Sequence, residues 1–289
     1  MSAPPAAADV KACCAAAYDG DAVALLLGAS YHPGGLALTR RLATTVGLRP
    51  GQRVLDVASG PGTTALLLAT EFAVSVDGVD LGDASLRKAT AAAQAAGLGD
   101  RVLFHRGDAE RLPFPAASFD AVVCECAFCT FPGKPAAASE FARVLRPGGR
   151  AGITDVTIAP GGLPGDLAGL AGWVACLADA RPADAYAALL GGAGLTVTAV
   201  EEHDEALGRM VDQIDARLRV LRMSGGRNQA LAGVDLDRAL ELTGQAARAV
   251  AAGVAGYTML VAEKPSSVPP RGDGRRGHRA GGSRAAGRC

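Results

Sequence analysis

Aromatic residues are scarce in this 289-residue chain, at 4% of the total with a single tryptophan. The chain also lacks net charge, since 29 basic residues balance 29 acidic ones, so nothing indicates a nucleic acid or another polyanion as a partner. It has no apolar run of about 18 residues, which excludes a membrane-spanning helix. The first residues lack the basic and apolar blocks of a secretory signal. Seven cysteines are too few for a disulfide scaffold and favour a reducing compartment, so we predict a cytoplasmic protein.

The composition changes along the chain and suggests three parts. Residues 265–289 contain six Arg and one Asp among many Gly, Pro and Ser, and such a segment cannot bury a core. We therefore expect a disordered basic tail there. Residues 1–49 are expected to form an N-terminal helical lid. Residues 50–264 are expected to form the main domain, with a helical insertion at about 204–255 before the last strand.

Short apolar segments alternate with helix-forming segments through the main domain. Helices are expected at 9–27, 36–46, 63–72, 83–96, 135–144, 184–191, 204–222 and 234–252. Strands are expected at 54–57, 74–79, 102–105, 120–124, 151–156, 195–200 and 257–262. This alternation is typical of an α/β protein with a Rossmann-like, doubly wound, mostly parallel sheet of seven strands.

A glycine turn follows the first of these strands. The sequence Val54-Leu55-Asp56-Val57-Ala58-Ser59-Gly60-Pro61-Gly62 reads as a buried strand and a tight turn, and a helix starts at Thr63. Such a unit binds the ribose and charged end of a nucleotide-like ligand. Asp80 ends the next strand, where a ribose-binding acid is expected. The loop alone leaves a nicotinamide cofactor and a methyl-donating cofactor both open.

Three further segments help to decide between these two cofactors. Gly107-Asp108-Ala109 follows the third strand, Phe119-Asp120 leads into the fourth, and Leu145–Arg150 precedes the fifth. In this order they resemble the class I S-adenosylmethionine-dependent methyltransferases over roughly residues 50–156. Ala58 departs from the pattern, because that family more often has glycine there. The resemblance leaves a nicotinamide dehydrogenase as a minor alternative.

The resemblance implies a set of cofactor contacts. Gly60 and Gly62 would let the chain pass close to the methionine part of S-adenosylmethionine, and Asp56 would order the loop and the ammonium group. Asp80 would accept hydrogen bonds from both ribose hydroxyls. After the third strand, Asp108 would bond the adenine amino group. Leu81, after the second strand, and Ala109 would stack on the adenine ring. At the end of the fourth strand, Cys124 and Glu125 would lie beside the sulfonium.

The cysteines suggest a methyl acceptor. Most of them fall on segments that should border one cleft: Cys13, Cys14, Cys124, Cys126, Cys129 and Cys176. Thiolates bind soft, thiophilic centres, so Cys14, Cys126 and Cys176 are candidate catalytic ligands of trivalent arsenic, with Cys13 and Cys129 as further substrate contacts. This placement is similar to that in the arsenite methyltransferases. Cysteine also packs as a small apolar residue, so core filling is the competing interpretation. No resident metal site is expected.

Two other functions remain open. The first is a C- or O-methyltransferase for a small quinone-like or natural-product acceptor, in which His32, Glu125 or His203 is the base and the cysteines fill the core. The second is a metalloid-binding module without turnover. Intact Asp56, Gly60 and Asp80 argue against the loss of cofactor binding. The expected partner is in each case a small molecule or metalloid.

Overall fold

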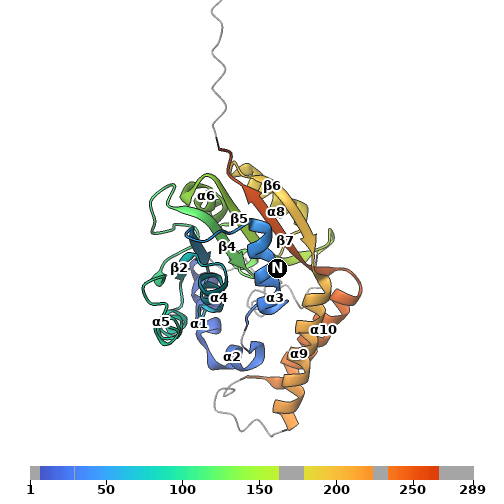
Figure 1. Ribbon diagram of the computed structural model, residues 1–289. Coiled ribbons are helices and arrows are strands. Elements are labelled where there is room, and N and C mark those ends of the chain that lie inside the picture. The colour runs from blue at the N-terminus through green and yellow to red at the C-terminus, as the bar shows by residue number, and fades with distance from the viewer. Residues whose placement is uncertain (1–6, 29, 163–178, 224–233, 267–289) are drawn as a thin grey trace, which may run out of the picture.

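The computed structural model describes residues 7–28, 30–162, 179–223 and 234–266. Within these ranges seven strands form one sheet in the order β3-β2-β1-β4-β5-β7-β6 (Figure 1). Strands β1 to β5 are parallel, and β7 is antiparallel to both β5 and β6. The strands are β1 (Arg53–Val57), β2 (Ser75–Asp80), β3 (Val102–Arg106), β4 (Phe119–Glu125), β5 (Leu145–Ile158), β6 (Thr196–Glu202) and β7 (Ala255–Glu263). The predicted fold class is confirmed.

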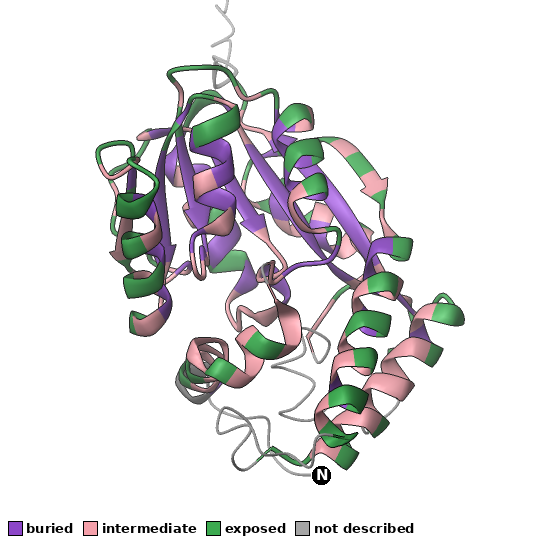
Figure 2. Cartoon of the chain, turned by 60° about the horizontal axis from the view of Figure 1, so that its bottom comes forward, coloured by how far each residue is buried: buried purple, intermediate pink, exposed green. Residues whose placement is uncertain are grey.

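Helices cover both faces of the sheet, and a core lies under each set. One face packs on α3 (Gly35–Val46), α4 (Thr63–Glu71) and α5 (Asp83–Ala95). The other packs on α6 (Lys134–Val144) and α8 (Ala183–Gly192). Because both faces are covered, the central strands are buried along almost their whole length, as Figure 2 shows. The strand ends, where polar groups are tolerated, are therefore the natural place for a site.

Four more helices lie at the end of the molecule where the parallel strands finish (Figure 1). Near the N-terminus these are α1 (Ala7–Asp19) and α2 (Asp21–Leu27), and before β7 they are α9 (Asp204–Met223) and α10 (Leu236–Ala251). Helices α9 and α10 pack on each other, and Arg217 of α9 donates a hydrogen bond to the carbonyl oxygen of Leu26 in α2. No helix in the described ranges is both long and apolar enough to cross a membrane.

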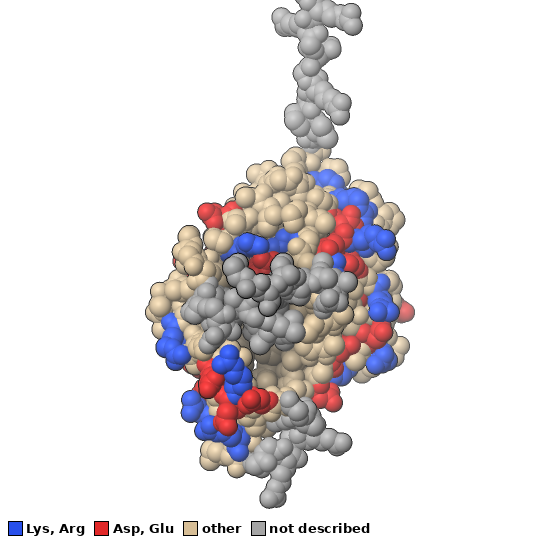
Figure 3. Space-filling model, turned by 180° about the vertical axis from the view of Figure 1, so that it is seen from behind, with Lys and Arg blue, Asp and Glu red and all other residues tan. Residues whose placement is uncertain are grey.

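The structure differs from the predicted elements in two places. Strand β5 starts at Leu145, directly after α6, because residues 148 and 149 pair with Lys264 and keep the Arg146–Gly149 turn against the sheet. A short 3-10 helix, η1 (Phe128–Thr130), follows β4 and has no counterpart in the prediction. The basic tail predicted at 265–289 lies largely outside the described residues. On the face in Figure 3, basic and acidic side chains are intermixed.

Helix α1 is attached to the main domain through Asp19. Its carboxylate accepts hydrogen bonds from the backbone amides of Ala84 and Ser85, 3.0 and 2.8 Å away, and so caps α5. Burial opposes the charged carboxylate, but hydrogen bonds from Ser85 and Ala84 and the charge of Arg87 outweigh it, so the pKa of Asp19 is lowered.

We expect Asp19→Ala to lower the free energy of unfolding by about 1 kcal/mol at neutral pH, since two helix-end amides lose their acceptor. A carboxylate with a lowered pKa stabilises the fold above its unfolded pKa, about 3.9, and this contribution is lost as pH falls through the folded value. Urea unfolding at pH 7 and near pH 3 measures both effects. Asp100→Ala, at an exposed turn, is the control. A difference that persists unchanged at acid pH would contradict the capping role.

Candidate functional site

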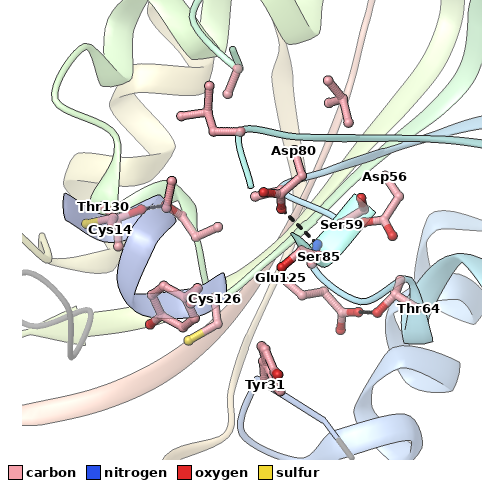
Figure 4. A pocket seen from close by; sticks show the side chains of 18 of the residues that line it. Cys14, Tyr31, Asp56, Ser59, Thr64, Asp80, Ser85, Glu125, Cys126 and Thr130 are labelled. Atoms are coloured by element: carbon pink, nitrogen blue, oxygen red, sulfur yellow. Dashed lines mark hydrogen bonds between the residues drawn. The ribbon is translucent and has the colours of Figure 1, made fainter. Parts of the chain in front are cut away.

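A pocket opens at the ends of β1, β2 and β4, and helix α1 lies along one side of it. The chain leaves β1 toward β2 on one side and returns to β4 on the other, so the pocket lies at the point where the strand order reverses. Figure 4 shows Asp56, Asp80 and Glu125 turned into this space. The pocket brings together most of the residues predicted from the sequence: Cys14, His32, Asp56, Ala58, Gly60, Asp80, Leu81, Asp108, Ala109, Glu125 and Cys126.

The β1–α4 loop contains two glycines with different roles. A Cβ atom on Gly60 would have only a Tyr31 ring atom within 4.0 Å, and the Gly60 amide donates to Asp80 at 2.8 Å. Gly60 therefore leaves room in the pocket, and its approach to the methionine part of the cofactor stays a prediction. Gly62 does not line the pocket, because a Cβ there would lie 2.6 Å from Phe104 and 2.9 Å from Ala89. The approach of the cofactor to the Gly62 backbone stays a prediction. This glycine permits close packing at the start of α4, where φ is +83°.

Asp56 is the most deeply buried acid of the site, with 2% of its surface exposed. Among the described residues its Oδ2 atom has no hydrogen-bond partner, and the same holds for the Ser59 hydroxyl beside it in the pocket lining. Burial, reinforced by the charges of Glu125 and Asp80, raises the pKa of Asp56 well above its ordinary value. A buried carboxylate oxygen without a donor fits a cationic group in the pocket.

Asp80 lies across the loop from Asp56 at the end of β2. Its two oxygens accept hydrogen bonds from the amides of Gly60 and Gly82, at 2.8 and 2.7 Å. Burial raises the pKa of Asp80 despite these donors. Each carboxylate oxygen can accept more than one hydrogen bond, so the residue keeps acceptor capacity for a diol at the pocket.

Lys11 connects α1 to the loop after β3. Its Nζ atom lies 2.8 Å from the Asp108 carboxylate and 2.6 Å from that of Glu110. Burial works against the ammonium, but hydrogen bonds and charge from Asp108 and Glu110 raise the pKa of Lys11 overall. The other Asp108 oxygen accepts from the Glu110 amide at 2.9 Å. The contact of Asp108 with the adenine amino group stays a prediction. Lys11 was missed, because nothing local in α1 distinguishes it.

A buried polar cluster closes the side of the pocket at the end of β4. The side chain of Glu125 is 4% exposed and accepts hydrogen bonds from Thr64 at 2.6 Å and from Thr39 at 3.1 Å. His32 joins it, with Nε2 lying 3.6 Å from Glu125 and 3.3 Å from the Thr39 hydroxyl. His32 and Glu125 were predicted separately. Thr39 and Thr64 were missed, although Thr39 follows His32 at a two-turn helical spacing.

The cysteines divide into two groups. Cys14 of α1 and Cys126 after β4 line the pocket and come from different elements (Figure 4). Cys126 has a φ of +53°, a left-handed backbone that non-glycine residues rarely adopt. Cys13 is half-buried and lies outside the pocket lining. Cys176 lies outside the described residues.

The predicted site roles of Cys124 and Cys129 are wrong. Cys124 has none of its surface exposed, because alternate side chains of β4 point to opposite faces and its thiol packs in the core under α6. Burial also raises the pKa of the Cys124 thiol well above its ordinary value. Cys129 is equally enclosed within η1, where its amide donates to the buried Asp155 at 2.8 Å. In the described ranges no three His, Cys, Asp or Glu side chains form a group that could hold a metal ion.

His203, the third candidate base, lies away from the pocket. Its amide donates to the Tyr257 carbonyl at 2.7 Å, and its ring is 3.6 Å from Glu201 on the neighbouring strand. It does not line the pocket. Of the three bases that the sequence suggests, the fold brings only His32 and Glu125 to the strand ends.

Comparisons with known proteins agree with this geometry. Residues 54–149 match a family model described as a methyltransferase domain. The 27-O-demethylrifamycin SV methyltransferase of Amycolatopsis mediterranei is 39% identical over 43% of this chain and 45% of its own. The nocamycin O-methyltransferase of Saccharothrix syringae is 39% identical over 40% of this chain and 42% of its own. The chain thus matches under half the length of these curated relatives.

A solved structure extends the likeness to most of the fold. The phosphoethanolamine N-methyltransferase 2 of Haemonchus contortus, in complex with S-adenosyl-L-methionine, superposes with a TM-score of 0.70. It is 22% identical, and the match covers 85% of this chain and 56% of the other. At this identity the comparison shows a shared fold.

Proposed function

We propose that this chain, whose residues 54–149 match a methyltransferase-domain model, is a class I S-adenosylmethionine-dependent methyltransferase that methylates an oxygen or carbon atom of a small organic acceptor. One observation carries the proposal. The pocket at the strand ends has buried carboxylates for a cationic cofactor on one side and the His32–Glu125 pair on the other. The relatives named for rifamycin and nocamycin methylation support an organic acceptor.

The cofactor would be held by the chain's strand-end groups. The partnerless oxygen of Asp56 and the Ser59 hydroxyl suit an ammonium group, and Asp80 suits the ribose diol. Leu81 and Ala109 supply apolar surface in the pocket lining for the adenine. S-adenosylmethionine supplies a methyl group on a positively charged sulfur. The protein must then align the acceptor, exclude water and accept a proton from an acceptor that carries one.

The parts of the chain would divide this work. In this proposal residues 1–49 form the lid over the pocket and residues 50–264 the catalytic domain. The helices of the insertion at about 204–255 shape the acceptor side through the contact of α9 with α2.

Turnover assays test the proposal directly. Purified protein is incubated with S-adenosylmethionine and a panel of phenols, enols, quinols and macrolide-like alcohols, and S-adenosylhomocysteine release is measured. At least one hydroxyl or enol acceptor should be methylated, and His32→Gln should lower that rate. His105→Gln, at a histidine on β3 outside the pocket lining, is the matched control. Tight cofactor binding without methylation of any organic acceptor would contradict an organic acceptor.

Proton release on cofactor binding is a second expected result. Asp56 carries a raised pKa without ligand, so it holds a proton at pH values where an ordinary aspartate has lost it. A bound cation favours the carboxylate and lowers that pKa. Binding should therefore release up to one proton, and affinity should rise with pH through this range. Calorimetry in phosphate and in Tris, which differ in ionisation heat, measures the release. Asp56→Asn should abolish it, and equal heats for the unaltered protein would contradict the assignment.

A thiophilic acceptor is the second candidate, and it rests on Cys14 and Cys126. Both line the pocket from separate elements, as ligands of trivalent arsenic would require. Arsenite, S-adenosylmethionine and a thiol reductant should then give methylated arsenic, and the Cys14→Ser/Cys126→Ser double variant should not. Arsenite that binds without turnover would indicate the metalloid-binding module. If arsenite neither binds nor reacts, the organic acceptor is the remaining candidate.

A further inference from the structure

The hydrogen bonds around His32 fix which of its nitrogens carries the proton. Nδ1 lies 3.2 Å from the carbonyl oxygen of Pro33, and a carbonyl oxygen can only accept. Nδ1 is therefore the protonated nitrogen, and a neutral His32 presents a lone pair at Nε2. Nε2 lies 3.3 Å from the Thr39 hydroxyl and 3.6 Å from Glu125, and His32 lines the pocket. The ring thus turns a proton acceptor toward the acceptor side.

The Thr39 hydroxyl is placed to satisfy either protonation state of His32. It lies 3.3 Å from Nε2 and 3.1 and 3.2 Å from the two Glu125 oxygens, but it has a single hydrogen to donate. Beside a neutral ring, the hydroxyl can donate to the Nε2 lone pair. Beside a protonated ring, it must accept from Nε2–H, and its hydrogen then points to Glu125.

Each member of the cluster is held in place. Thr39 is 1% exposed on α3, so its side chain has little freedom except rotation of the hydroxyl hydrogen. Thr64 donates to Glu125 from the other side at 2.6 Å and keeps the carboxylate oriented. Other titratable groups share the pocket with His32: its neighbour Tyr31, Lys11, Cys14 and Tyr18 from α1, Asp56 from β1, Asp80 from β2, Asp108 from the loop after β3, Glu125 at the end of β4, and Cys126 directly after it.

We propose that Thr39 is a positioning residue whose hydroxyl turns from His32 to Glu125 as His32 takes the proton of the methyl acceptor. The inference rests on the proposed function. The acceptor O–H bond would break as the Nε2–H bond forms, and the oxygen would use the electron pair it keeps to bond the methyl group. The sulfur–methyl bond would break at the same time, and its electron pair would stay on the sulfur of the departing S-adenosylhomocysteine. Glu125 then faces an imidazolium across 3.6 Å and balances its charge.

The tautomer of His32 is a test that needs no acceptor. Full-length protein with 15N-labelled histidine gives separate two-bond 1H–15N patterns for the two neutral tautomers. The chain has four histidines, and the signal lost in His32→Gln assigns the one of interest. The expected pattern is Nδ1–H in the neutral ring. An Nε2–H pattern would overturn the proposal, because Nε2 would then have no lone pair for the proton.

Kinetics with matched threonine variants are the second test. Thr39→Val removes the hydroxyl and should lower kcat by about tenfold with KM for S-adenosylmethionine unchanged. Thr39→Ser keeps the hydroxyl and should restore the rate. Thr44→Val is the control, since this exposed hydroxyl of α3 bonds only to the Arg40 carbonyl. A loss of kcat in Thr39→Ser equal to that in Thr39→Val would overturn the hydroxyl's role. If no acceptor is methylated at all, the proposed function fails, and the tautomer result still stands.

Discussion

Replacing Asp80 by alanine is expected to weaken S-adenosylmethionine binding by at least about 100-fold. The carboxylate accepts hydrogen bonds from the Gly60 and Gly82 amides and so holds the glycine loop. In the proposed site, its remaining lone pairs would accept from the ribose hydroxyls. Hydrogen bonds to a charged group contribute about 1.5–3 kcal/mol each, and two lost ribose contacts correspond to this change in affinity. Titration calorimetry with the full-length chain measures it.

The Asp80 experiment has two companion variants. Asp80→Asn keeps one acceptor oxygen and the side-chain shape, so its affinity should fall between those of the unaltered protein and Asp80→Ala. Asp77→Asn, on the same strand, removes a buried charge that bonds Arg53 and His105 outside the pocket lining, and should leave affinity unchanged. An Asp80→Ala affinity within about threefold of the unaltered protein would rule out the ribose contact.

Gly62→Ala is expected to lower the free energy of unfolding by about 4 kcal/mol. The left-handed backbone at φ +83° costs a residue with a Cβ about 1–2 kcal/mol. The added methyl would also lie 2.6 Å from Phe104 and 2.9 Å from Ala89, and such overpacking costs about 1–3 kcal/mol more. Urea unfolding followed by circular dichroism measures the change.

Gly97 offers the matched control for this experiment. It also has a positive φ, +68°, but no atom lies within 4 Å of the position that a Cβ would occupy. Gly97→Ala should therefore show the backbone cost alone, about 1–2 kcal/mol. Equal destabilisation by the two substitutions would mean that the contact with Phe104 relaxes without cost, against the packing role assigned to Gly62.

The sequence was sufficient for the fold and for the groups at the strand ends. Apolar runs with period and length typical of strands place Asp56, Asp80 and Glu125 where each strand finishes, and parallel strands bring their carboxyl ends to one edge. The turn glycines were also visible, but their roles were not. A side chain at Gly62 would meet Phe104, whereas one at Gly60 would not. Phe104 is distant from Gly62 in the sequence, and the fold brings the two residues together.

The cysteine hypothesis shows that the sequence does not determine which side of a strand a side chain faces. Cys124 and Glu125 are consecutive, yet the first points into the core and the second into the pocket. Only the register of β4 decides between them, and a shift of one residue would exchange the two. Thr39 and Lys11 were missed for a related reason. Their partners come from the end of strand β4 and from the loop after β3, far along the chain, and no local sequence pattern indicates those contacts.

The two attachments of α1 respond to different solvent conditions. The Lys11 contacts with Asp108 and Glu110 are ion pairs with partly exposed side chains, so added salt screens them. The Asp19 contacts are carboxylate-to-amide hydrogen bonds, which salt weakens less and acid removes. Added salt should therefore loosen the Lys11 end of the helix and leave the Asp19 end attached, whereas acid that protonates Asp19 weakens both attachments. If α1 must swing away for product to leave, moderate salt should speed exchange of bound S-adenosylhomocysteine before it affects the stability of the fold.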